Sequence, residues 1–159
     1  YKRNPMRSER ICSLARFAVE GGAVRDHTIE RLKDWPRHEG PVAICKYRGS
    51  VVHAGERIYI QHSYSLHHQV LGLAILYASQ RARQRLLSGV FVSVSGGPGR
   101  QPFAARLVYE FLGQDIEVRA ALARCGLYPD DAPPLAAEIR QRVANAVPPG
   151  EDVMRALEY

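Results

Sequence analysis

The stretch 89-GVFVSVSGGPGRQPFAARLVYEFL-112 carries the strongest local pattern in the sequence and is the starting point for predicting the fold. Residues 89–95 alternate valine with aromatic, hydroxyl or glycine residues, which is the period of two typical of a strand with one buried and one open face. The glycine-rich residues 96–100 read as a loop, and residues 101–112 place apolar side chains at helical spacing. We therefore expect a strand, a loop and a helix, with the three valines of the strand facing the core.

The flanking sequence extends this prediction to the whole chain. Helical patterns are expected at residues 8–20, 26–35, 63–87, 115–124 and 131–146. Short strands are expected at residues 42–47, 50–53 and 57–61, which the punctuation at Gly49 and Gly55 would join as hairpins. The predicted class is α+β, with a small, mainly antiparallel sheet packed with helices and a helical C-terminal third. Residues 1–147 are expected to form a single globular domain, and residues 148–159 a short C-terminal helical tail.

The charge distribution points to a negatively charged partner. Residues 57–109 contain no aspartate or glutamate but hold six arginines, in a chain whose net charge is +6. A surface of one sign repels itself, so a basic segment of this kind favours an anionic ligand. Arginine also greatly outnumbers lysine here, and its guanidinium binds phosphate oxygens in a bidentate fork. The same composition would also arise from a buried middle segment with little room for carboxylates, or from the codon usage of a GC-rich genome.

These observations predict a basic nucleic-acid-binding protein. RNA is favoured over DNA because the sequence shows no helix-turn-helix, zinc-finger or basic-zipper pattern. The residues expected to contact phosphates are Arg57, Arg81, Arg85, Arg100 and Arg106. The open face of the sheet supplies a second set for base stacking and 2′-hydroxyl contacts, unless a helix or second subunit covers it: Tyr59, Phe91, Ser93 and Ser95.

The glycine-rich loop is a separate candidate for binding phosphate. A helix that begins after glycines presents free backbone N–H groups and a partial positive charge, and an arginine stands at its start. The predicted phosphate loop comprises Gly96, Gly97, Gly99 and Arg100. Its spacing matches no nucleotide-binding motif, so a plain strand-to-helix turn is the alternative. A small enzyme that binds a phosphorylated ligand at this loop is one alternative function.

The sequence favours a non-enzymatic role. The acid-free segment removes the orienting carboxylate from a region that holds three of the six histidines, and no GxSxG motif is present. No histidine or cysteine spacing indicates a metal site, so we predict no catalytic residue, metal or cofactor. Three widely spaced cysteines favour a reducing compartment, cytoplasmic or nuclear, or the inside of a virion. No apolar run is long enough to cross a bilayer, and we expect no transmembrane segment or signal peptide.

A second alternative is a structural or interaction protein, such as a viral matrix-like or host-targeting module, with a basic partner-binding surface. A homodimer would protect the edges of a short sheet. Residues 65–67, 70–72, 89–90 and 92–97 together with Arg100 resemble pieces of the tombusvirus silencing suppressor that binds small RNA duplexes. The spacing leaves no room for a strand that this family has, and its paired tryptophan clamp is absent, so we assign no family.

Overall fold

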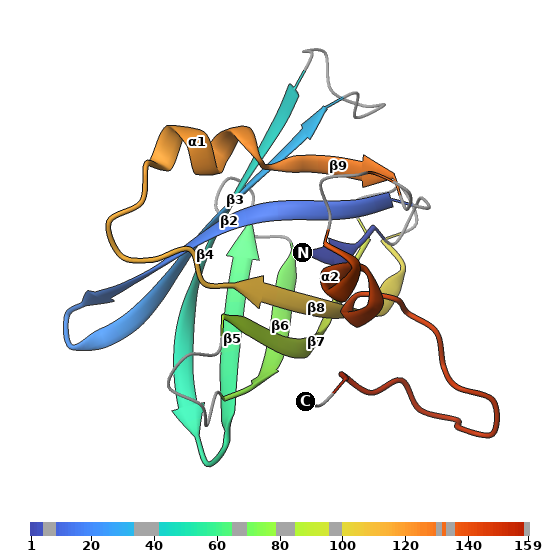
Figure 1. Ribbon diagram of the computed structural model, residues 1–159. Helices are drawn as coiled ribbons and strands as arrows, with labels where there is room; N and C mark the ends of the chain where they lie inside the picture. Colours follow the sequence, from blue (N-terminus) through green and yellow to red (C-terminus); the bar gives the residue numbers. More distant parts are fainter. Residues whose placement is uncertain are drawn as a thin grey trace.

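Strands dominate the computed structural model, which describes residues 1–4, 9–33, 42–64, 70–78, 85–95, 100–129, 132 and 136–157. The nine strands found in these residues are β1 (Lys2–Arg3), β2 (Glu9–Glu20), β3 (Ala23–Lys33), β4 (Val42–Ala54), β5 (Arg57–Tyr64), β6 (Leu71–Tyr77), β7 (Leu86–Val94), β8 (Pro102–Glu110) and β9 (Gly126–Pro129). Two short helices, α1 (Val118–Ala123) and α2 (Ala137–Arg142), lie outside the sheet (Figure 1).

Strands β1 to β8 form a closed antiparallel barrel. From β2 to β8 each strand pairs with the next along the chain, and the short β1 closes the ring because it pairs with both β8 and β2. Lys2 is the residue in register with both neighbours, Leu107 on β8 and Ile11 on β2. Strand β9 is not part of the ring, and it pairs with the first residues of β2. Gly55 has a φ of +59° at the turn between β4 and β5, a conformation that glycine adopts without steric cost.

The barrel encloses an apolar core at its centre, since alternate residues of each strand point inward. Eight strands leave an interior that side chains can fill. The buried core consists of Ile60, Ala74, Leu76, Phe91 and Leu107, with Val51, Ile58, Phe103 and Tyr109 packed against it. A second buried pair, Ile11 and Leu32, packs with Cys45 and Leu127.

The C-terminal residues cover part of the outer wall. Ile139 and Val143 of this segment are buried. Arg106 on β8 donates through its guanidinium to the carbonyl oxygens of Ala144 and Arg155, both at 2.6 Å, and its backbone N–H donates to Asn145 Oδ1 at 2.8 Å. These bonds fix the segment against β8.

The predicted α+β class, with its helical C-terminal third, is wrong. The described parts of the expected helices at residues 8–20, 26–35, 63–87 and 101–112 are mainly strand, and only α1 and α2 lie where helices were expected. Residues 148–157 of the predicted helical tail contain no helix. The error has a physical cause, because several inward positions are polar. Residues 23–33 carry polar side chains on both faces, so their sequence shows no alternation of apolar and polar residues.

In the described residues, neither helix has the length or the apolar composition needed to span a bilayer.

Candidate functional site

The barrel interior holds a buried ion pair between its first and third strands. Lys2 Nζ donates to Glu30 Oε1 at 2.6 Å. Ser13 Oγ donates to the same oxygen at 3.2 Å, and Tyr47 OH donates to Oε2 at 3.2 Å. The Lys2 ammonium also lies 4.6 Å from the centre of the Phe91 ring, within range of a cation–π interaction.

These contacts decide the protonation of the buried groups. Burial alone would raise the pKa of Glu30, but the Lys2 ammonium and the three hydrogen bonds outweigh that effect and hold this pKa below its usual value. Burial, followed by the neighbouring Glu30 charge, raises the pKa of Tyr47 well above its ordinary range. Glu30 is therefore a carboxylate and Tyr47 a protonated donor, so the cluster is internally satisfied.

A second buried polar group lies further along β3. Asp26 is fully buried, and its carboxylate accepts a hydrogen bond from Thr28 Oγ1 at 2.9 Å and lies 3.3 Å from His62 Nδ1. In the sheet, His62 pairs with Gly49 on one side and with Gly72 on the other. A Cβ atom at Gly72 would lie 2.7 Å from His62 Nε2 and within 2.6 Å of the Phe91 ring. Aspartate and histidine form an orienting pair in many catalytic sites. Here the His62 ring packs against the rings of Tyr47 and Phe91, and the residue is 7% exposed.

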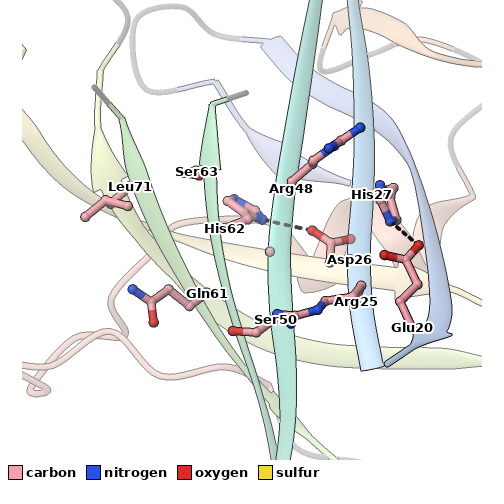
Figure 2. A pocket seen from close by; sticks show the side chains of 11 residues that line it. Glu20, Arg25, Asp26, His27, Arg48, Ser50, Gln61, His62, Ser63 and Leu71 are labelled. Carbon is pink, nitrogen blue, oxygen red and sulfur yellow. Dashed lines mark hydrogen bonds and ion pairs between the residues drawn. The ribbon is translucent and has the colours of Figure 1, made fainter. Parts of the chain in front are cut away.

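The accessible concave surface lies on the outside of the same wall. A groove of about 500 Å³ crosses β3, β4 and β5 (Figure 2). We call it the outer groove; it is lined by Glu20, Arg25, Asp26, His27, Arg48, Gly49, Ser50, Gln61, His62, Ser63 and Leu71.

Strand register brings the polar side chains of the outer groove together. Successive side chains of a strand point to opposite faces of the sheet. Asp26 and His62 point into the barrel, so the residues next to them in sequence point outward. Two rows then run across the three strands, in which directly paired residues stand side by side. The rows are Arg25, Ser50 and Gln61, and His27, Arg48 and Ser63.

The outer groove presents two arginine side chains to solvent. Arg25 and Arg48 are exposed, and neither side chain makes a hydrogen bond or ion pair with the residues that the structure describes. Among the described residues that line the groove, Glu20 is the one exposed acid, and it is already engaged because its Oε1 lies 2.9 Å from His27 Nε2. Two unpaired guanidinium groups beside hydroxyl and amide side chains can bind an anion such as phosphate.

The four described arginines among those predicted to contact phosphates do not gather on one surface. Arg57, at the start of β5, stacks 4.4 Å from the Tyr77 ring. Arg85, before β7, pairs with Glu110 at 3.6 Å. Arg100 precedes β8 at the opposite end of the β7–β8 pair, Arg106 is 5% exposed, and Arg81 lies outside the described residues.

The face of β7 that was expected to be open points into the barrel, and the face expected to be buried points outward. Phe91 is 5% exposed and Val92 is 49% exposed, so the valines of β7 point away from the barrel interior. Ser93 Oγ donates to the Leu71 carbonyl oxygen at 2.7 Å, and Ser95 Oγ accepts from the Gln101 N–H at 3.1 Å. Both serines are buried. Of this second set, Tyr59 alone is on the outer surface.

The described residues do not test the predicted phosphate loop, because its glycines lie outside them. Gly96, Gly97 and Gly99 lie outside the described residues, while Arg100 is exposed with a φ of +41°. The element that follows is strand β8 instead of the expected helix, so the backbone N–H groups and dipole of a helix start are not available there. The enzyme alternative loses this part of its physical basis.

Sequence reasoning missed Arg25 because the acids Asp26 and Glu30 stand among the basic residues of β3. It missed Arg48 because residues 48 and 49 were expected to be a turn between two short strands, whereas β4 continues through them. The signal that could have identified them is the period of two, which places adjacent residues on opposite faces. Histidine, cysteine and acidic side chains form no cluster of three or more suited to a metal ion in the described part of the chain. Comparison of the chain with protein-family models, curated proteins and solved structures found no match.

Proposed function

We propose that this domain binds single-stranded nucleic acid, with RNA favoured, along the outer groove. The observation that carries the proposal is the pair of exposed arginines, Arg25 and Arg48, which stand on adjacent strands without partners among the described residues. Each would bind a backbone phosphate. A net charge of +6 would support the encounter with a polyanion.

The side chains beside the two arginines have the chemistry needed to contact the base and the sugar of a nucleotide. Ser50, Gln61 and Ser63 offer hydroxyl and amide groups for base edges and 2′-hydroxyls. Tyr59 lies on the same outer face of β5 as Gln61, two residues away or about 7 Å along the strand, and is exposed enough to stack on a base. By analogy at the level of architecture, other small barrels bind oligonucleotides on their outer strands.

The test is fluorescence anisotropy with a labelled single-stranded RNA of about 12 nucleotides, titrated at several salt concentrations. Arg25→Ala and Arg48→Ala should each weaken binding several-fold. Each should also reduce the slope of log affinity against log salt by about 0.7, because one phosphate contact and its released counterion are lost. Arg85→Ala removes the same charge from an arginine outside the groove and is the matched control.

Two results would contradict the proposal. Binding that does not depend on salt would exclude phosphate contacts as its basis. Equal losses in all three variants would show that net charge alone attracts the RNA, and that the outer groove is not the site. The same titration with DNA of the same sequence measures the preference for RNA.

A second candidate is an interaction module, because apolar side chains lie beside the groove. These exposed residues, which we call the outer apolar strip, occupy neighbouring outward positions on β4 to β7: Val52, Tyr59, Leu71, Leu73, Ile75 and Val92. Contiguous exposed apolar surface commonly marks a protein interface. A stable dimer in light scattering would favour this candidate.

A further inference from the structure

Two cysteines that are distant in sequence meet on the outside of the barrel wall. Cys12 lies on β2, and its pairing partner across the β2–β9 ladder is Gly126, the residue after Cys125. Cys125 therefore lies beside Cys12 across this ladder, and each thiol shifts the pKa of the other. Figure 1 shows how this arises, because β9 runs beside β2 and α1 leads directly into β9. The third cysteine, Cys45, is on β4.

The pair has the asymmetry of a nucleophilic and a resolving thiol. The interaction with Cys125 lowers the pKa of Cys12 to about 7 against the opposing effect of burial. The N-terminal ammonium, Tyr1 and the Arg124 charge lower this pKa further. The interaction with Cys12, together with burial, raises the pKa of Cys125. Near neutral pH, Cys12 therefore supplies a thiolate, while Cys125 stays protonated beside it. Burial raises the pKa of Cys45, so that thiol is the less reactive control.

Access to the pair depends on α1. Cys12 and Cys125 are 6% and 5% exposed. The helix α1, which precedes Cys125, is lightly packed, since Ala121 is the one buried residue of its six. The Ala121 carbonyl oxygen, 3.8 Å from Cys125 Sγ, is a second acceptor within reach of the single Cys125 proton. Local opening of such a lightly packed segment requires far less free energy than global unfolding. A peroxide molecule is small enough to enter through such an opening.

We propose that Cys12 and Cys125 are a redox-active pair that hydrogen peroxide converts to a disulfide, tying the α1–β9 segment to barrel strand β2. The Cys12 thiolate attacks one peroxide oxygen, so that an S–O bond forms, the O–O bond breaks and hydroxide leaves as water after taking a proton. The Cys125 sulfur then gives up its proton and attacks the sulfenic sulfur; an S–S bond forms and the second hydroxide leaves as water. Two thiols and one peroxide give one disulfide and two waters, with two electrons passing to the peroxide.

The experiment treats the folded, reduced chain with a small excess of hydrogen peroxide and counts thiols by alkylation and intact mass. The parent and Cys45→Ser should each lose two thiols and about 2 Da, with a peptide map linking Cys12 to Cys125. Cys12→Ser and Cys125→Ser should form no internal disulfide, and circular dichroism checks that both variants fold. In the parent, oxidation should raise the melting temperature by on the order of 10 °C, and dithiothreitol should reverse the change.

Three results would overturn the proposal. The first is a folded parent that keeps all three thiols under this treatment. The second is a disulfide that includes Cys45. The third is a Cys12–Cys125 link that forms only in denaturant, since the native contact would then have no part in the reaction.

Discussion

Replacing Lys2 with methionine tests whether the barrel interior holds a true buried ion pair. The side chains of Lys2 and Glu30 are 17% and 4% exposed, and their charged atoms lie 2.6 Å apart. Methionine keeps much of the apolar stem but leaves the Glu30 carboxylate buried without its cation. Removing one partner of a buried pair costs about 3–5 kcal/mol, so Lys2→Met should lower the free energy of unfolding at pH 7 by that amount.

The pH dependence of this loss gives a sharper result. In the parent, the pKa of Glu30 lies below its ordinary value of 4.5, so its contribution to stability is present above that pH and is lost as the pH falls through the lower folded pKa. Without Lys2, burial dominates and should raise the folded pKa above 4.5. The variant then regains stability as the pH falls from 7 towards 4.5. The difference between parent and variant should therefore shrink on acidification.

Urea unfolding at several pH values measures this difference, and Lys2→Met combined with Glu30→Gln is the matched control. The double variant contains neither charge of the pair, so it should recover part of the loss and abolish its pH dependence. A cost below about 1 kcal/mol, or a difference that stays constant with pH, would refute the reasoning. Lys2 would then be a solvated lysine, and Glu30 would depend on its hydroxyl donors.

Two further predictions test the faces of the barrel. Phe91→Ala should lower the free energy of unfolding by roughly 3–5 kcal/mol because it removes an aromatic ring that fills the core. Val92→Ala should lower it by less than about 1 kcal/mol because that residue is 49% exposed. Equal losses in urea unfolding would mean that the two faces are wrongly assigned. Arg106→Ala should increase amide hydrogen exchange across residues 136–157, because it removes the hydrogen bonds to the Ala144 and Arg155 carbonyl oxygens. An unchanged exchange rate would show that apolar packing alone holds this segment.

Part of the fold could be predicted from local sequence. The strand expected at residues 89–95 is present within β7, and the turn expected at Gly55 joins β4 to β5. Short helices are present within the ranges expected at residues 115–124 and 131–146. These elements depend on local signals, such as the alternation of residues 89–95 and the glycine and proline residues that end helices and strands.

The orientation of the strands could not be predicted in the same way. A period of two shows that a strand has two faces, but it does not show which face is buried. Hydrophobicity alone assigns Val92 to the core, yet the barrel places Phe91 and Ser93 inside. That choice depends on partners far away in the sequence, such as Lys2 for Glu30 and His62 for Asp26. The contact between Cys12 and Cys125 spans the chain in the same way and leaves no local pattern.

The barrel also changes what the charge composition means. Residues 25–31, RDHTIER, hold two acids and two arginines, so a count along the sequence finds this part of β3 neutral. Alternation separates these charges, because Asp26 and Glu30 point into the barrel, where they face His62 and Lys2, while Arg25 points outward. An acid held inside the wall by its own partner cannot also pair with an arginine on the outside. The acids of β3 are therefore kept away from the arginines of the outer groove. This separation by strand geometry leaves Arg25 and Arg48 without an acidic partner among the described residues, which is the state that binding a phosphate requires.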